Sequence, residues 1–149
     1  MKRALGIIVI LIIAFLIVMA VANRKHDDGG VAAFKNQLKA DTYGGQNPVE
    51  TLKLLVKALK DEDLELASKY FILNDDGNRE EWLRLLEEVQ ERGGLADLIA
   101  KLDQAQPYVK DISHKNDFKF FIADEKGGIE TVINLEKNSF SGVWKIESL

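Results

Sequence analysis

Residues 4–22 form an uninterrupted apolar run, ALGIIVILIIAFLIVMAVA, which follows the basic start Met1-Lys2-Arg3. As a helix that rises about 1.5 Å per residue, this run would be about 28 Å long, close to the hydrocarbon thickness of a bilayer. A helix on the surface of a soluble domain would carry a polar face, and this run has none. The sequence therefore predicts that residues 1–22 are a transmembrane signal anchor that holds the chain in a cell membrane.

The end of the apolar run leaves an alternative open. Residues 20–22 fit the small-residue pattern of a signal-peptidase site, and cleavage near Ala22 would release a secreted structural protein. The run is longer than the roughly 7–15 residues of a signal-peptide core, which favours retention. Lys2-Arg3 before the run is balanced by Arg24-Lys25 after it, and the free amino terminus adds charge to the first side. We therefore expect the amino terminus inside and the following domain on the extracytoplasmic side.

Charge argues against nucleic acid as a partner. Outside residues 1–22 the chain carries 18 basic and 24 acidic side chains, and its Lys and Arg are scattered. The chain has no cysteine, which excludes disulfides, thiolate catalysis and cysteine-based zinc sites. The domain must therefore be stabilised by a hydrophobic core.

Composition divides the remainder into a tether and a folded domain. Residues 23–46 contain two glycine pairs and few large apolar side chains, so we expect a flexible tether in which Val31 to Lys39 can form a short helix. At Asn47-Pro48, an asparagine that can cap a helix precedes a proline suited to its first position. We therefore place the domain at residues 47–149, and expect a chain that starts near Gly45 to be folded, soluble, and monomeric or weakly dimeric.

Apolar spacing predicts helices first and strands afterwards. Three stretches show helical spacing, and a shorter helix capped by Asp63 follows the first of them. After Pro107 the period changes to two, with turns at 124–128 and 138–142, and a further strand is expected around residues 108–113. The expected fold is α+β, with three helices or more packed on one face of a curved antiparallel sheet of three or four strands. The pattern is carried by Leu52, Leu55, Val56, Leu59, Trp82, Leu85, Leu86, Val89, Leu95, Leu98, Ile99 and Leu102 in helices, and by Phe118, Phe120, Ile122, Ile129, Thr131, Ile133, Leu135 and residues 143–146 in strands.

The segment NPVETLKLLVKALKDEDLELASKYF, residues 47–71, resembles the opening helix pair of the nuclear transport factor 2-like superfamily. Gly142-Val143-Trp144-Lys145-Ile146 is similar to the closing strand of small bacterial membrane-tethered or lipoprotein members of unknown function. The resemblance covers roughly residues 47–149. It implies a cone of helices wrapped on a bent sheet, with an apolar pocket that some relatives use for catalysis or ligand binding and others leave empty. By the resemblance Asp63 is the acid at the helix corner, and its simplest role is to cap the second helix.

Few residue types suited to catalysis or metal binding occur. Histidine is the commonest general base, and the chain has His26 in the expected tether and His114 before the sheet, without a second histidine or cysteine to act with either. The loop at 74–78 has the composition of a calcium loop, but aligning its glycine places Ile72 and Leu83 at the terminal ligand positions. We therefore predict no catalytic residue, no metal ligand and no cofactor.

Eight aromatic side chains of the expected helices and strands could line a pocket, but a small domain needs most of them to fill its core. The leading hypothesis is a membrane-anchored extracytoplasmic module that binds a protein or a small apolar ligand without catalysis. The alternative is an isomerase- or hydrolase-like enzyme, which would need a buried carboxylate within hydrogen-bond reach of a tyrosine. The aromatic residues are Tyr70, Phe71, Trp82, Tyr108, Phe118, Phe120, Phe121 and Trp144.

Overall fold

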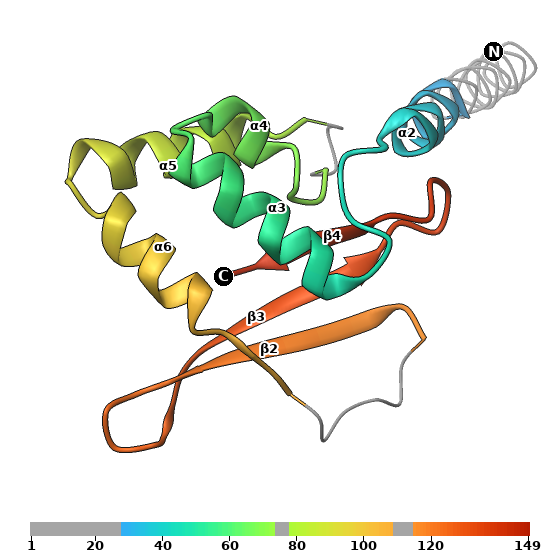
Figure 1. Cartoon of the computed structure of the whole chain (residues 1–149). Coiled ribbons are helices and arrows are strands. Elements are labelled where there is room, and N and C mark those ends of the chain that lie inside the picture. Colours follow the sequence, from blue (N-terminus) through green and yellow to red (C-terminus); the bar gives the residue numbers. More distant parts are fainter. Residues whose placement is uncertain (1–27, 74–77, 109–114) are drawn as a thin grey trace, which may run out of the picture. The chain divides into compact units, whose positions relative to one another are not determined.

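The computed structural model describes residues 28–73, 78–108 and 115–149 (Figure 1). Within these ranges the fold is α+β, with five helices and a four-stranded antiparallel sheet. The chain divides into two compact units, Met1–Asn36 and Gln37–Leu149. No helix in the described ranges has both the length and the hydrophobicity of a membrane span. The anchor predicted at residues 1–22 lies outside those ranges.

Helix α2, Asp28–Ala40, occupies much of the stretch expected to be a flexible tether, and it is longer than the short helix expected from Val31 to Lys39. Its last residues belong to the second unit, which begins at Gln37. There the Nδ2 of Asn138 donates to the carbonyl of Leu38 at 2.9 Å. The folded unit therefore begins before residue 47, and local composition did not show this because the partner lies 100 residues away.

Four further helices follow: α3 at Pro48–Lys60, α4 at Leu64–Ser68, α5 at Glu80–Glu91 and α6 at Leu95–Asp103. The helix pair expected from the sequence is confirmed together with its caps. The Oδ1 of Asn47 accepts from the Glu50 amide at 2.9 Å, and the Oδ1 of Asp63 accepts from the Leu66 amide at 2.9 Å. Each contact satisfies an amide at a helix start that has no partner within the helix.

The sheet is formed by β1 at Gln106–Pro107, β2 at Asp117–Ala123, β3 at Ile129–Lys137 and β4 at Trp144–Ser148. Neighbouring strands are antiparallel in the order β1-β2-β3-β4, so the predicted meander is confirmed. The short β1 precedes the strand expected around residues 108–113, most of which lies outside the described ranges.

One hydrophobic core joins the helices to one face of the sheet. On β2 and β3 the core face consists of alternate residues, as the period of two predicts. The largest fully buried apolar side chains of this core are Phe71, Phe120, Leu55, Leu59, Ile133, Leu135 and Ile146.

The connection between α2 and α3 is fastened to β4. The Trp144 amide donates to the Gly45 carbonyl at 3.0 Å, and the Thr51 hydroxyl donates to the Trp144 carbonyl at 3.0 Å. Gly44 has a φ of 145°, and a Cβ at this position would lie 2.3 Å from the Trp144 carbonyl oxygen. A glycine is therefore required where the connection crosses the strand.

Candidate functional site

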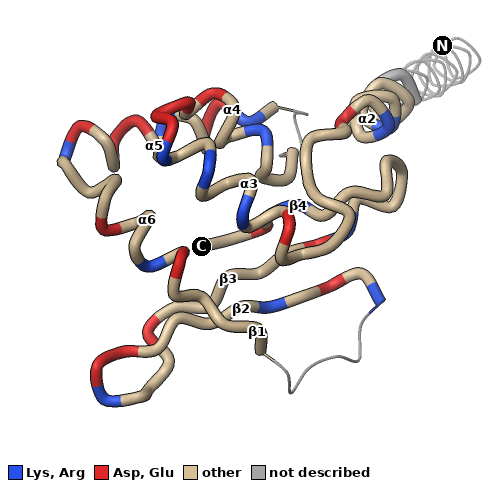
Figure 2. Tube along the Cα trace, viewed as in Figure 1, with Lys and Arg blue, Asp and Glu red and all other residues tan. Residues whose placement is uncertain are grey.

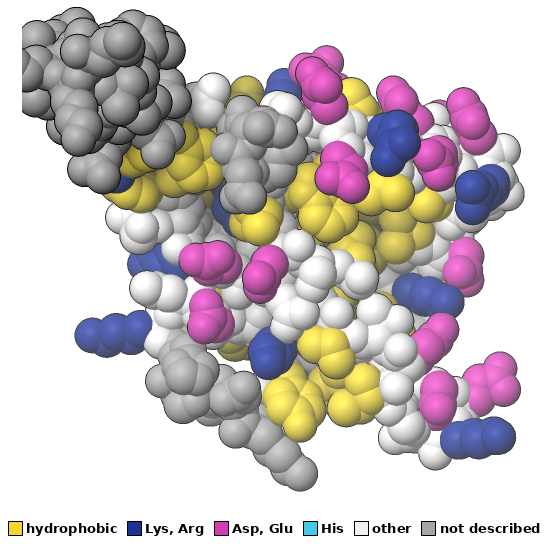
Figure 3. Space-filling view, turned by 180° about the vertical axis from the view of Figure 1, so that it is seen from behind, with side chains coloured by type: hydrophobic (Ala, Val, Ile, Leu, Met, Phe, Trp, Pro, Cys, Tyr) yellow, Lys and Arg dark blue, Asp and Glu magenta, His cyan; other side chains and the backbone are white. Residues whose placement is uncertain are grey.

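The face of the sheet that points away from the helical core carries a group of apolar side chains. Phe121 pairs with Val132 across β2 and β3, and both alternate with core residues. The ring of Tyr108 packs edge-on against Phe121, with centroids 6.1 Å apart. Ile129 pairs with Ala123 and is 54% exposed, while Val132 is 38% exposed. We call Tyr108, Phe121, Ile129 and Val132 the apolar row, and apolar side chains are visible on this side of the molecule in Figure 3.

Farther along the same face lies a group of carboxylates. Asp117 pairs with Glu136 across β2 and β3, and Glu147 is the extra residue of a bulge on β4. Figure 2 shows acidic positions on all three strands. In the described part of the chain none of these three side chains forms an ion pair. We call Asp117, Glu136 and Glu147 the acidic triplet.

Crowding within the acidic triplet has an electrostatic consequence. Partial burial raises the pKa of Glu136 above its usual value, and the charges of Glu147 and Asp117 raise it further. A negative charge nearby repels a carboxylate and so favours its protonated form, which raises its pKa. The triplet is therefore a surface that gains from an added cation.

A polar row separates the two groups. Lys119 pairs with Asn134 across β2 and β3. The Nδ2 of Asn134 donates to the Ser148 hydroxyl at 2.7 Å, which joins β3 to β4. The outer face thus changes from apolar to polar to acidic along the strands.

Beside the acidic triplet, β4 contributes a buried lysine. Lys145 pairs with Glu136 in register but is only 2% exposed. Its Nζ donates to Asp41 Oδ1 at 2.6 Å and to the Lys69 carbonyl at 2.8 Å. Arg79 donates from its guanidinium to the other Asp41 oxygen, and from Nε to the Phe71 carbonyl at 2.7 Å.

This network of Asp41, Lys145 and Arg79 consists of strongly desolvated charges. Burial lowers the pKa of Lys145 to about 8, although the hydrogen bond and charge of Asp41 oppose the shift. Burial also lowers the pKa of Arg79, again against the effect of Asp41. Asp41 is the one buried carboxylate among the described residues. The enzyme alternative would pair such a carboxylate with a tyrosine, whereas the partners of Asp41 are the cations Lys145 and Arg79.

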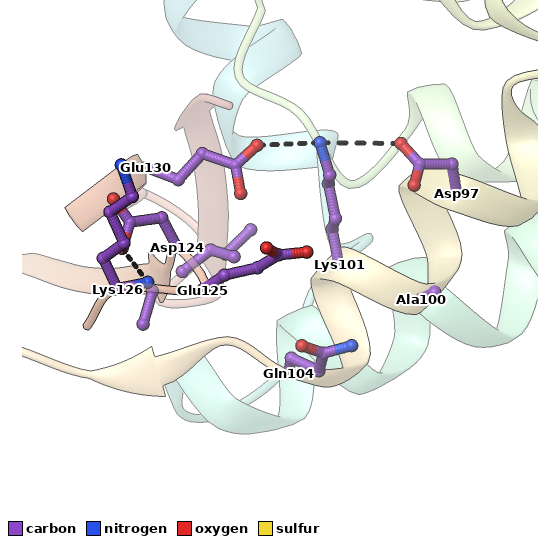
Figure 4. A pocket seen from close by; sticks show the side chains of 10 residues that line it. Asp97, Ala100, Lys101, Gln104, Asp124, Glu125, Lys126 and Glu130 are labelled. Carbon is purple, nitrogen blue, oxygen red and sulfur yellow. Dashed lines mark hydrogen bonds and ion pairs between the residues drawn. The ribbon is translucent and has the colours of Figure 1, made fainter. Parts of the chain in front are cut away.

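A separate open cleft of about 580 Å³ lies between α6 and the β2–β3 hairpin. In it, Lys101 lies between Glu130 at 2.9 Å and Asp97 at 3.5 Å, as Figure 4 shows. Its ion pairs raise the pKa of Lys101, chiefly through Glu130. Glu125 projects into the cleft from the hairpin turn. The cleft is polar, and of its two lysines, Lys101 and Lys126, Lys101 is engaged by acids of the same chain.

The eight aromatic side chains of the helices and strands fall into two groups, one in the core and one on the outer face of the sheet. Six of them belong to or pack against the core, as predicted for most: Tyr70, Phe71, Trp82, Phe118, Phe120 and Trp144. Tyr108 and Phe121 instead belong to the outer face. His26, His114 and most of the loop at 74–78 lie outside the described residues.

Sequence reasoning missed both the outer-face surface and the buried network. Phe121 is out of phase with the core residues of its strand, and this was a visible indication of an apolar outer face. Nothing local identified the network, because Asp41 and Lys145 are 104 residues apart. No family model, curated protein or solved structure matches the chain.

Proposed function

We propose that the chain is a membrane-anchored, extracytoplasmic and non-catalytic interaction module that binds a protein partner on the outer face of its sheet. The apolar run at residues 4–22 supports the anchor. The observation that carries the binding role is the apolar row, where half-buried Tyr108 and Phe121 lie with exposed Ile129 and Val132 on the sheet face away from the helical core.

An exposed apolar group of this kind is informative because it is contiguous. Single apolar side chains on a surface are ordinary, whereas adjacent ones bordered by polar residues are typical of interaction sites. Aromatic residues are enriched in such sites, and the row contains two. The polar row at Lys119 and Asn134 supplies the border on one side.

A protein partner is favoured over a small apolar ligand. In the unit Gln37–Leu149 the space between α3 and the sheet is filled by large side chains such as Phe71, Phe120 and Ile133. The apolar row is a surface of paired strands rather than a cavity, which suits an extended chain that lies along it. We also propose that the unit belongs to the nuclear transport factor 2-like superfamily, supported by its helices-then-meander order and by the two sequence segments that resemble that superfamily.

Photo-crosslinking in the native cells tests the binding role. A photoreactive phenylalanine analogue at Val132 of the full chain should give one discrete adduct with another protein. The same analogue at Lys53, an exposed residue of α3, is the control and should not give this adduct.

The adduct would then be identified by mass spectrometry and the purified partner titrated against the full chain. Val132→Glu should weaken binding by about tenfold or more, because it places a charge in the buried centre of the interface. Equal adducts at both positions, or unchanged affinity of the Val132→Glu chain, would contradict the proposed function.

A further inference from the structure

Resting on that proposed function, we infer that the partner presents an extended, basic segment, with apolar side chains on the apolar row and lysine or arginine at the acidic triplet. The outer face combines two groups of different chemistry in a fixed order along the same strands. A partner that matches only one of them leaves the other exposed.

The spacing of the two groups suits an extended chain. On β3 the outer-facing positions include Val132, Asn134 and Glu136, and on β2 the matching positions are Phe121, Lys119 and Asp117. Four residues of a strand span about 13 Å. An extended segment that lies along the strands has the same rise per residue and the same alternation of side chains. An apolar residue and a cation four positions apart in it would therefore reach the apolar row and the acidic triplet.

The charges favour a cationic partner. The three carboxylates have no ion-pair partner in the described part of the chain, and the nearest cation in register, Lys145, is held by Asp41. The charges of its two acidic neighbours help to raise the pKa of Glu136, and a lysine or arginine there would offset this repulsion. Charge-assisted contacts of this kind set which partner is accepted.

A second copy of the chain is the weaker occupant. Its outer face carries the same acidic triplet, and its cation in that row is the same buried lysine. The folded part as a whole has more acidic than basic side chains. A second copy would therefore bring to the triplet a face on which three carboxylates outnumber Lys119 of the polar row.

The test uses the full chain in detergent micelles and two synthetic peptides. Each peptide alternates threonine with residues of one face, apolar in the amino-terminal half and charged in the other half. The charged residues are lysine in the first peptide and glutamate in the second. Fluorescence anisotropy should show the lysine peptide binding about tenfold or more tightly than the glutamate peptide, with an affinity that falls as salt rises.

Three variants separate the contributions. Glu136→Gln should reduce affinity for the lysine peptide several-fold, whereas Glu91→Gln on α5, which removes the same charge elsewhere, should leave it unchanged. Val132→Glu should weaken binding of the lysine peptide through the apolar row.

The outcomes distinguish this inference from the proposed function. Equal binding of both peptides, or an unchanged affinity in Glu136→Gln, overturns the basic partner while the crosslinked partner at Val132 leaves the interaction role intact. A dimer that Val132→Glu dissociates, with no peptide binding, assigns the face to a second copy. Absence of both the peptide binding and the Val132 adduct overturns both proposals.

Discussion

At the scale of single residues, the network of Asp41, Lys145 and Arg79 has a large energetic consequence. Desolvating charges is costly, and the cost is offset only when each charge keeps its partners. Here one carboxylate serves two cations, and the spare lysine and guanidinium hydrogens reach the carbonyls of Lys69 and Phe71. Removing the carboxylate is therefore more damaging than removing either cation.

Asp41→Asn should lower the free energy of unfolding by about 3–5 kcal/mol, because it leaves buried Lys145 and half-buried Arg79 without a counter-charge. Urea unfolding followed by circular dichroism measures the change. Asp103→Asn is the matched control, since it breaks the exposed ion pair with Lys60 and should cost less than about 1 kcal/mol. Similar losses in the two variants would show that the buried network contributes little.

The lowered pKa of Lys145 predicts a pH dependence. The folded value is about 8 and the ordinary value is 10.5, so between these pH values the unfolded chain binds more protons than the folded chain. The free energy of unfolding should therefore rise with pH in this window, by up to about 3 kcal/mol. Below about pH 8 the lysine is charged in both states and adds no slope.

Lys145→Met isolates this effect, because it removes the titrating group and keeps much of the apolar stem. Unfolding curves at intervals from about pH 7.5 to 9.5 should show a positive slope in the natural chain that the variant lacks. Parallel pH profiles for the two chains would mean that Lys145 does not titrate in this window.

At the scale of secondary-structure elements, β4 is central to the fold. It pairs with β3 on one edge, and on the other edge Ile146 exchanges hydrogen bonds with Tyr70 and Ile72 at 2.9 Å. Trp144 contributes its side chain to the core and its backbone to the connection between α2 and α3. The strand therefore connects the sheet to α3 and to the segment that follows α4.

Trp144→Ala should cost about 3–5 kcal/mol, the range for removing a large aromatic side chain from a core. Trp144 is 9% exposed, and its ring packs edge-on against Phe118 at a centroid distance of 6.4 Å. The control is Phe140→Ala in the turn before β4, where the side chain is 44% exposed and the loss should be below about 0.5 kcal/mol. A melting temperature of Trp144→Ala close to that of the natural chain would place the indole outside the core.

Whether a feature could be predicted from the sequence depends on how far apart in the sequence its interacting residues lie. Asn47 and Asp63 cap helices through amides three residues away, and such local contacts are visible as motifs. Lys145, by contrast, follows the alternation that predicts an exposed side chain, and it is buried because Asp41 covers it from a distant part of the chain. The apolar row was visible only in part, because the phase of Phe121 indicated an apolar outer face but its pairing with Val132 depends on strand register.

At the scale of the whole molecule, the extent of the folded unit changes what a truncation should do. A chain that starts at Gln37 keeps Asp41 and should be folded and soluble. A chain that starts near Gly45 loses Asp41, so its free energy of unfolding should be lower by about 3–5 kcal/mol. Urea titrations of the two purified chains compare them directly, and equal midpoints would show that residues 37–44 add nothing to stability.

The apolar run at residues 4–22 belongs to the same scale. Deleting residues 1–22 should move the protein from the membrane fraction to the soluble fraction of the cell, because all hydrophobicity of bilayer-spanning length lies there. Fractionation and immunoblotting measure this, with carbonate-washed membranes as the stringent sample. Retention of the shortened chain in washed membranes would contradict the anchor.

The fastening of the α2–α3 connection to β4 also has a consequence for the order of folding. Asp41 and Thr51 contact residues 144 and 145, close to the carboxyl terminus. Contacts of such long sequence separation form late and slow the folding of a domain. A nascent chain can form α3 and α4 early, but it can close its core only after the final strand has left the ribosome. Removing the last few residues, which form β4, should therefore abolish the native fold rather than only shorten the sheet, since both ends of the unit must be present together.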